Sequence, residues 1–356
     1  MPRVGLSNNS GNRMPRARRL VHRTAIAGER LIDRFRAPES RKPLLEAYRG
    51  YATPDRLVLR GRVLASLRRG EPAPDQTKWV NFKQMLSLFM TDEVADVVVT
   101  TADGTYASVS DEEGYLTLEL PRPADGGPGW TFVPLRIAGS EAFDVSFPAL
   151  VPDPAARFGV ISDIDDTMME TGAYSLARNL WTTFTGSALT RSIFPDSIAL
   201  MQALQAAGNA PVFYVSSSPW NLHHFLDTVL IGAGLPAGPM FLRDFGISET
   251  QFVSGTHGNH KGMAIDRILD ANPGLPFVLL GDTGQHDAEV YGEAVKRHPG
   301  RIAAIALHEH VSGVGAGTKA AIEAIRGTGT PVFSAPAFAE VHERLLAALR
   351  RLLQSV

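Results

Sequence analysis

The stretch ISDIDDTMMETG, residues 161–172, follows an apolar run and groups three carboxylates within four positions: Asp163, Asp165 and Asp166. Carboxylates this close repel one another, so the grouping needs a physical reason. One interpretation is a solvated acidic turn, since aspartate is common in turns. The other is a metal-assisted phosphoryl-transfer site, because clustered carboxylate oxygens suit Mg²⁺. The sequence around the stretch has to distinguish the two.

Strand-like runs alternate with amphipathic runs throughout residues 151–356. The strand-like runs are RFGVISDID, APVFYVSSS, GPMFLRD, PFVLLGD, RIAAIALHE and TPVFSA. Helical runs between them include FPDSIALMQALQAAG, PWNLHHFLDTVLIGAG and HKGMAIDRILDANPG. Apolar strands separated by amphipathic helices are typical of a parallel sheet covered on both faces. With right-handed crossovers, the pattern predicts a doubly wound α/β domain over residues 151–356.

Residues 55–150 have a different pattern, which predicts a smaller antiparallel β domain. Short runs rich in Val, Leu and Thr are separated by the turn-like segments ADG, DEEG and PADGGPG. Leucines alternate with polar residues over 115–120, which indicates one buried face. A small β-sandwich is the predicted architecture, serving as a structural companion or as a binding module. The proline-rich FPALVPDPAARFG is predicted to be the boundary.

Composition and charge restrict the class of protein. The chain of 356 residues is long enough for two domains, and its net charge of −2 argues against nucleic-acid binding by bulk electrostatics. With no cysteine, disulfides, zinc–thiolate sites and thiol catalysis are excluded, and a reducing cytoplasm fits. We expect neither a signal peptide nor a membrane-spanning segment.

Residues 1–54 form a basic segment that we expect to be partly disordered and partly helical. Nine arginines lie within residues 1–36, against Glu29 and Asp33. A loose helical pattern in RRLVHRTAIAGERLIDRF leaves two interpretations open. The helix either makes peripheral contact with anionic membrane lipid or packs on the protein with its charged face in water.

Polar side chains follow three of the predicted strands, at the edge where ligands bind in such folds. Asp163 and Asp165 follow the first strand, and the serines at 216–218 follow VFYV. Asp282 and Asp287 follow FVLL. Turns that are polar by chance would not all lie at that edge, so the placement favours a phosphoryl-transfer site. One carboxylate can attack phosphorus, a second can transfer protons, and a lysine can stabilise the negative charge.

Taken in order along the chain, D-x-D-x-T, Ser, Lys and G-D-x-x-x-x-D resemble the haloacid dehalogenase-like superfamily. Within it, SDIDDT, YVSSSPWNL, FLRDFG, HK and LLGDTGQHD are similar to the catalytic domain of the actin-patch-associated phosphatidate phosphatases. The resemblance covers residues 157–309. It implies a Rossmann-like α/β fold, Asp163 as nucleophile, Asp165 as general acid/base and Lys261 as the stabilising charge. The phosphate-binding residues would be Thr167, Ser216 and Ser217.

The resemblance also implies a Mg²⁺ site. Its ligands would be the carboxylates of Asp163 and Asp282 and the backbone carbonyl of Asp165, with Asp287 orienting that shell or reaching the metal through water. Thr283 departs mildly from the pattern, because serine is more often expected there. For Asp166 we favour helix capping and local hydrogen bonding.

Some residues near the motifs have structural alternatives. Ser217 and Ser218 have an alternative interpretation as the cap of a helix beginning at Pro219. An apolar rim, or else core packing, is predicted for Trp181, Phe184, Trp220 and Phe225.

The function best supported by these features is Mg²⁺-dependent hydrolysis of a lipid phosphomonoester such as phosphatidate, giving diacylglycerol and phosphate. The segments after Thr167 and Pro219 are too short for a large lid domain, so the site would stay open to a substrate held in a membrane. Two alternatives remain. One is a phosphatase of soluble phosphomonoesters or phosphoproteins on the same scaffold. The other is a phospho-ligand or lipid-binding protein without turnover.

Overall fold

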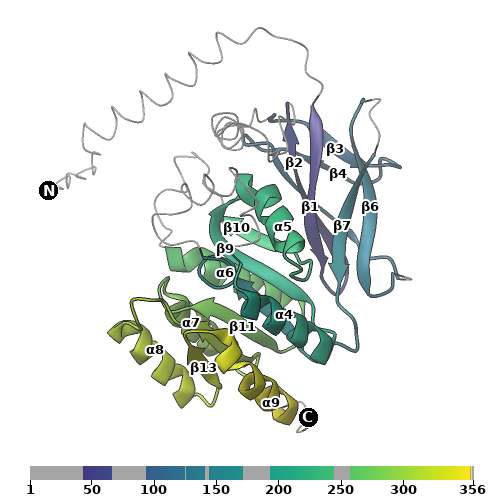
Figure 1. The fold of residues 1–356 in the computed structure, drawn as a ribbon. Helices are drawn as coiled ribbons and strands as arrows, with labels where there is room; N and C mark the ends of the chain where they lie inside the picture. Colours follow the sequence, from purple (N-terminus) through teal and green to yellow (C-terminus); the bar gives the residue numbers. More distant parts are fainter. Residues whose placement is uncertain are drawn as a thin grey trace, which may run out of the picture. The chain divides into compact units, whose positions relative to one another are not determined.

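A parallel six-stranded sheet forms from the region of alternating runs, in the order β10-β9-β8-β11-β12-β13 (Figure 1). The computed structural model describes residues 43–65, 94–124, 126–140, 144–170, 193–243, 257–352 and 354. The strands of this sheet are β8 (Gly159–Asp163), β9 (Val212–Pro219), β10 (Met240–Arg243), β11 (Phe277–Asp282), β12 (Ile302–His308) and β13 (Val332–Ala335). The predicted α/β region with a parallel sheet is therefore confirmed.

Helices cover both faces of this sheet. They are α4 (Pro195–Gly208), α5 (His223–Gly232), α6 (His257–Ala271), α7 (Asp287–Arg297), α8 (Ala316–Gly327) and α9 (His342–Leu352), with short 3₁₀ turns η1 (Trp220–Leu222) and η2 (Phe338–Glu340). Successive strand residues point to opposite faces. Val160 packs in a cluster with α4, α5 and α9, whereas Ile161 packs in a cluster with α6, α7 and α8. Burial on both faces explains why the strands are almost continuously apolar.

A separate, mostly antiparallel sheet precedes it, with the order β4-β3-β6-β7-β1-β2-β5. Its strands are β1 (Leu44–Ala52), β2 (Arg56–Leu64), β3 (Val98–Thr101), β4 (Ala107–Val109), β5 (Tyr115–Pro121), β6 (Gly129–Ile137) and β7 (Val145–Val151). Leu116 and Leu118 are buried while Thr117 and Glu119 are exposed, as the alternation predicts. The edge strands β4 and β5 also meet, because the Ser108 hydroxyl donates to the Thr117 carbonyl at 2.8 Å. The sandwich arrangement itself stays a prediction.

The antiparallel sheet begins earlier than predicted, at β1, whereas the sequence pattern places its start at residue 55. The cause is a strand that is covered on both sides over much of its length, so polar and apolar residues do not alternate along it. The β1–β2 register shifts between Tyr48 and Tyr51. Gly50 lies at this shift, where a Cβ atom would come within 2.2 Å of the Val58 carbonyl oxygen. The predicted proline-rich boundary likewise begins inside β7, which contains Pro148.

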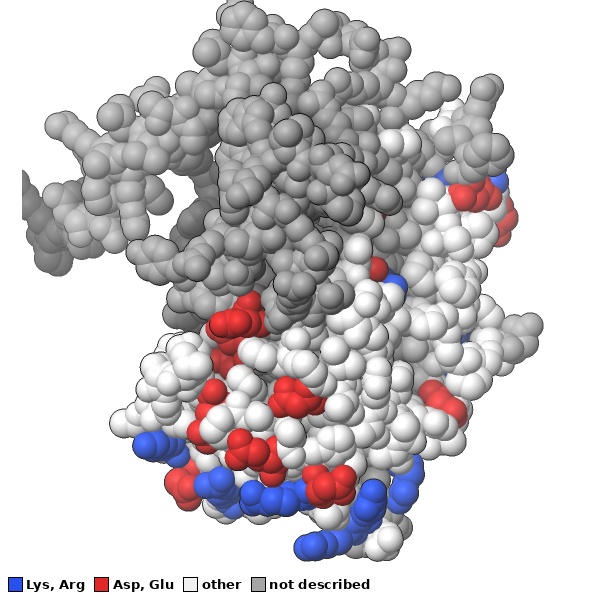
Figure 2. Space-filling model, in the orientation of Figure 1, with Lys and Arg blue, Asp and Glu red and all other residues white. Residues whose placement is uncertain are grey.

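Several sequence predictions fall on residues that the structure does not describe. The arginine-rich residues 1–36 lie outside the described residues, as do Trp181 and Phe184. Among the described helices, none combines the length and apolar character needed to cross a bilayer. On the face shown in Figure 2, Lys and Arg side chains lie beside Asp and Glu side chains along the lower edge, so the two signs are mixed there.

Candidate active site

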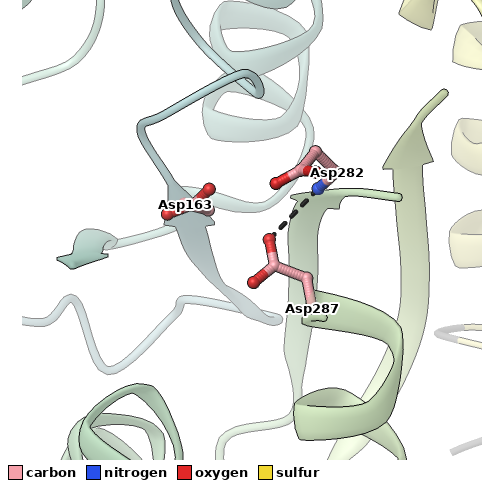
Figure 3. A group of neighbouring side chains, drawn as sticks. All are labelled: Asp163, Asp282 and Asp287. Atoms are coloured by element: carbon pink, nitrogen blue, oxygen red, sulfur yellow. Dashed lines mark hydrogen bonds between the residues drawn. The ribbon is translucent and has the colours of Figure 1, made fainter. Parts of the chain in front are cut away.

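Three carboxylates from the predicted site meet at the carboxyl edge of the parallel sheet (Figure 3). Asp163 ends β8, Asp282 ends the neighbouring strand β11, and Asp287 begins α7. One carboxylate oxygen of each lies within 4.8 Å of the others, and all three residues are buried. The structure thus brings together side chains that are more than 100 residues apart in the sequence.

The turn between β11 and α7 holds its own carboxylates in place. Asp282 Oδ1 accepts hydrogen bonds from the backbone N–H groups of Gly284 and Gln285, the latter at 2.8 Å. The Asp282 N–H donates to Asp287 Oδ2 at 3.1 Å, the bond drawn in Figure 3. Gly281 lies beside it, where a Cβ atom would come within 2.6 Å of Asp287 Oδ2. The GD and the last D of GDTGQHD therefore form one closely packed unit.

Lys261, near the start of α6, lies between two of the carboxylates. Its Nζ atom is 3.0 Å from Asp163 Oδ1 and 2.5 Å from Asp287 Oδ1, and its side chain is buried. Burial alone lowers the pKa of Lys261, but Asp163 and Asp287 more than offset this and raise it above its ordinary value. The lysine is therefore a fixed positive charge inside the cluster.

Asp165 lies in the turn after β8 and is held by two serines of β9. Its Oδ2 atom accepts from the Ser216 hydroxyl at 2.6 Å and from the Ser218 hydroxyl at 3.1 Å. The Ser218 N–H in turn donates to the Ser216 hydroxyl oxygen at 2.9 Å. Asp165 Oδ1 is buried without a hydrogen-bond partner among the described residues. Burial raises the pKa of Asp165, against the effect of the Ser216 bond.

The predicted phosphate-binding residues lie in different environments. The Thr167 hydroxyl donates to Asp163 Oδ2 at 3.3 Å, and the Thr167 carbonyl accepts from the Ser197 hydroxyl of α4 at 2.8 Å. Ser216 is bonded to Asp165, and Ser217 is half-buried. Neither η1 nor α5 has a side-chain N-cap bond, so the capping interpretation of Ser217 and Ser218 is wrong.

The hydrogen bond from Ser218 to Asp165 is not predicted by the sequence motifs. The spacing does indicate it, because residues two apart on a strand point to the same side and Ser216 is a predicted site residue. For Asp166 the expected local hydrogen bond is present, from its N–H to the Met169 carbonyl at 2.8 Å, but residues 166–168 form a turn and not a helix that it could cap. Asp166 has a left-handed backbone with φ of 55°, and its Oδ2 accepts from Gln285 Nε2 at 3.2 Å. The bond links the turn after β8 to the turn after β11.

The cluster carries more negative charge than its lysine can balance. Burial and the neighbouring carboxylates, opposed by Lys261, raise the pKa of Asp163 well above its ordinary value. Burial and Asp287 raise the pKa of Asp282 to about 7. Asp282 Oδ2 is also buried without a hydrogen-bond partner among the described residues. An unpartnered oxygen and excess negative charge fit a divalent cation with oxygen ligands.

The fold and the site together define a class of protein. Its members have buried aspartates, one buried lysine and paired serines at the carboxyl edge of a parallel α/β sheet. Residues 158–309 match the family model described as the catalytic domain of phosphatidate phosphatase APP1. This region contains each predicted site residue, and it agrees with the 157–309 span expected from the motifs. The resemblance to that catalytic domain is therefore confirmed.

Two curated fungal relatives match the same part of the chain. Phosphatidate phosphatase APP1 of Saccharomyces cerevisiae is 30% identical over 160 residues, which is 45% of this chain and 27% of the relative. An uncharacterized protein of Schizosaccharomyces pombe is 28% identical over 157 residues, 43% of this chain and 25% of the relative. The chain therefore aligns with about a quarter of the length of each.

A solved flavohemoglobin from Malassezia yamatoensis also aligns, over 89% of this chain and 65% of its own. Its identity is 10% and its TM-score is 0.17, values too low to support an inference about fold or function.

Proposed function

We propose that this chain is a Mg²⁺-dependent phosphatase that hydrolyses a phosphomonoester through an aspartyl-phosphate on Asp163. The observation that carries the proposal is the environment of that carboxylate. Asp163 lies 3.0 Å from Lys261 Nζ and 3.3 Å from the Thr167 hydroxyl, within 4.8 Å of oxygens of Asp282 and Asp287. A carboxylate placed beside fixed positive charge and further metal-type ligands suits attack on a phosphoryl group.

A lipid phosphate such as phosphatidate is the substrate we favour, with diacylglycerol and phosphate as products. The match of residues 158–309 to the catalytic domain of phosphatidate phosphatase APP1 supports this choice. The fold we infer for residues 151–356 is the doubly wound, haloacid dehalogenase-like one. Helices packed on both faces of the parallel sheet support that inference.

In the first step, an Asp163 oxygen attacks phosphorus and the bond between phosphorus and the ester oxygen breaks. The departing oxygen takes a proton from the Asp165 carboxyl group. Both serine bonds to Asp165 go to Oδ2, which leaves the buried Oδ1 as the oxygen available for proton transfer. The division of hydrolysis into two displacements is what a nucleophilic carboxylate contributes.

In the second step, a water molecule attacks the phosphorus of the aspartyl-phosphate. Asp165, now ionised, accepts a proton from that water, and the bond between phosphorus and Asp163 breaks. Phosphate leaves and both carboxyl groups return to their starting states. Lys261 keeps its positive charge throughout and balances the charge that develops on the phosphoryl oxygens.

The cation would be held by the carboxylates of Asp163 and Asp282 and by the backbone carbonyl of Asp165, with Asp287 supporting them. When bound, it supplies positive charge that reduces repulsion between the carboxylates and an anionic phosphate. Thr167, Ser216 and Ser217 would bind phosphoryl oxygens. For Ser216 this requires sharing its hydroxyl group with Asp165.

Phosphate release from a substrate panel tests the proposal. The purified full chain would be assayed on phosphatidate in mixed micelles, short-chain phosphatidate, sugar phosphates and phosphopeptides, each with Mg²⁺ and with chelator. We expect Mg²⁺-dependent release that is fastest from phosphatidate. Preference for a sugar phosphate or phosphopeptide would contradict the lipid substrate while preserving the chemistry. Full activity after exhaustive chelation would contradict the metal dependence.

A further inference from the structure

Arg60 on β2 reaches out of the antiparallel sheet and lies between two aromatic rings of the α/β region. Its guanidinium carbon is 4.8 Å from the Trp220 ring centroid and 4.7 Å from that of Phe241. Its Nη1 group donates to the Met240 carbonyl at 3.3 Å. Both ring distances are within the range of cation–π attraction. Burial lowers the pKa of Arg60 to about 10, so these contacts stabilise a charge that has lost much of its water.

Trp220 is enclosed by further residues of the antiparallel sheet. Tyr48 on β1 stacks on it, with centroids 5.2 Å apart and planes inclined by 12°. Tyr115 on β5 approaches it at 6.4 Å. Three strands of the antiparallel sheet thus contribute to one indole site, and aromatic stacking adds to the cation–π attraction.

Both rings that contact Arg60 are close in the chain to proposed active-site residues. Trp220 follows Pro219, whose ring restricts the backbone, and lies two residues after Ser218, which bonds Asp165. Phe241 pairs with Val215, the residue before Ser216. The backbone of Phe241 also hydrogen-bonds to the imidazole of His260, which precedes Lys261.

We infer that Arg60 is a positioning residue, which holds the Ser216–Ser218 segment through Trp220 and thereby orients the Asp165 carboxylate. The antiparallel sheet then belongs to the catalytic unit and is not an independent binding module. The kinetic consequence rests on the proposed phosphatase function. The structural coupling does not, because it concerns only contacts within the protein.

The first test compares Arg60→Met with Leu57→Ala in the full chain. Arg60→Met keeps an unbranched apolar side chain but removes the guanidinium. Leu57 lies on the same strand, is fully buried and packs in the core of the antiparallel sheet, so Leu57→Ala is the control for general destabilisation. Both variants would be assayed at a temperature where circular dichroism shows them folded.

For Arg60→Met we expect kcat to fall between about 10- and 10²-fold, because a misplaced acid/base group slows the chemistry. KM should rise by a smaller factor than kcat falls, since Thr167 and Lys261 keep their positions while only Ser216 and Ser217 shift. Leu57→Ala should leave kcat nearly unchanged. Equal losses of kcat in the two variants would overturn the inference.

Hydrogen exchange without substrate tests the coupling independently of activity. In Arg60→Met, amides of residues 214–222 should exchange at least about 10-fold faster than in the wild type, while those of β11 stay unchanged. Unchanged exchange at 214–222 would overturn the inference. If the wild type shows no phosphatase activity, the proposed function fails while this measurement still decides the coupling.

Two further variants keep the test decisive. If Arg60→Met does not fold, Arg60→Lys replaces it, because lysine keeps the charge but lacks the planar group that stacks on the rings; the same kinetic and exchange results are expected. In the double variant that joins the Arg60 substitution to Trp220→Leu, kcat should be no more than about 2-fold lower than in Trp220→Leu alone, since both substitutions act on one contact. Losses that multiply would show that Arg60 does not act through Trp220 and would overturn the inference.

Discussion

Lys261 and Asp163 form an ion pair at the edge of the parallel sheet, and their side chains are only 4% and 1% exposed, respectively. Arg56 and Glu119 form an ion pair on the antiparallel sheet, and their side chains are 56% and 51% exposed, respectively. The exposed pair is hydrated and screened, and such pairs contribute about 0–1 kcal/mol to stability. The buried pair sits among two further carboxylates, an arrangement that costs desolvation and repulsion. Stability alone does not explain the buried cluster, whereas the proposed cation binding and chemistry would.

The largest expected effect is that of Asp163→Asn on turnover. An amide cannot form the phosphoenzyme, so we expect phosphate release to fall by at least about 10⁴-fold. At the same time the metal-free variant should be as stable as the wild type or more so, because one repelling carboxylate is gone. Asp166→Asn, a neighbour without a proposed catalytic role, is the matched control and should keep most activity. Substantial turnover by folded Asp163→Asn would remove the nucleophile assignment.

Lys261→Met tests the buried side of the comparison by chemical denaturation. Removing the only cation among the described residues of the cluster leaves the carboxylates uncompensated, so the free energy of unfolding without Mg²⁺ should fall by about 3–5 kcal/mol. Arg56→Met removes one partner of the exposed pair and should cost about 0–1 kcal/mol. Similar costs for the two variants would mean that the buried cluster does not depend on its lysine.

Asp165→Asn should lower kcat by about 10²- to 10⁴-fold, because neither protonation of the departing oxygen nor activation of water remains. Substrates with good leaving groups need less protonation, so p-nitrophenyl phosphate should lose less in the first step than phosphatidate. Single-turnover kinetics on both substrates would measure this. A uniform loss well below 10²-fold would assign the acid/base role to another group.

The smallest expected effect is stabilisation by Mg²⁺ without substrate. A ligand that binds only the folded state stabilises it by about 2.7 kcal/mol at a concentration 100 times its Kd. Thermal melts over a Mg²⁺ series should therefore show a rising Tm for the wild type and a much weaker rise for Asp282→Asn. Asp270→Asn, on the surface of α6 and outside the cluster, serves as the control. Equal rises in all three proteins would place the cation elsewhere.

The sequence predicted the parallel sheet and its edge well, because both depend on local patterns. Buried parallel strands are apolar throughout, and the polar residues after them, such as Asp163 and Asp282, stand out against that background. β1 is not predicted from the sequence, because packing on both of its faces removes the alternation of polar and apolar residues that identifies a half-buried strand. The helices α8 and α9 are not among the helical runs named from the sequence, although α8 lies between two predicted strands.

The sequence predicts which residues make up the candidate site, but it does not predict the hydrogen bonds and ring contacts between them. That Ser216 and Ser218 both bond Asp165 depends on how β9 lies against the turn after β8. The place of Arg60 between Trp220 and Phe241 depends on contacts between two sheets, which no local pattern encodes. Trp220 is half-buried beside the core, between the predicted alternatives of rim and core.

Identification of the phosphoenzyme tests the central claim most directly. The full chain would be mixed with Mg²⁺ and short-chain phosphatidate, quenched in acid within the first turnover, digested and analysed by mass spectrometry, with Asp163→Asn as the control. We predict one added phosphoryl group on Asp163 that hydroxylamine removes, as expected for an acyl phosphate, and none in the variant. Turnover with no phosphorylated peptide at any quench time, or a phosphoryl group on another residue, would contradict the account.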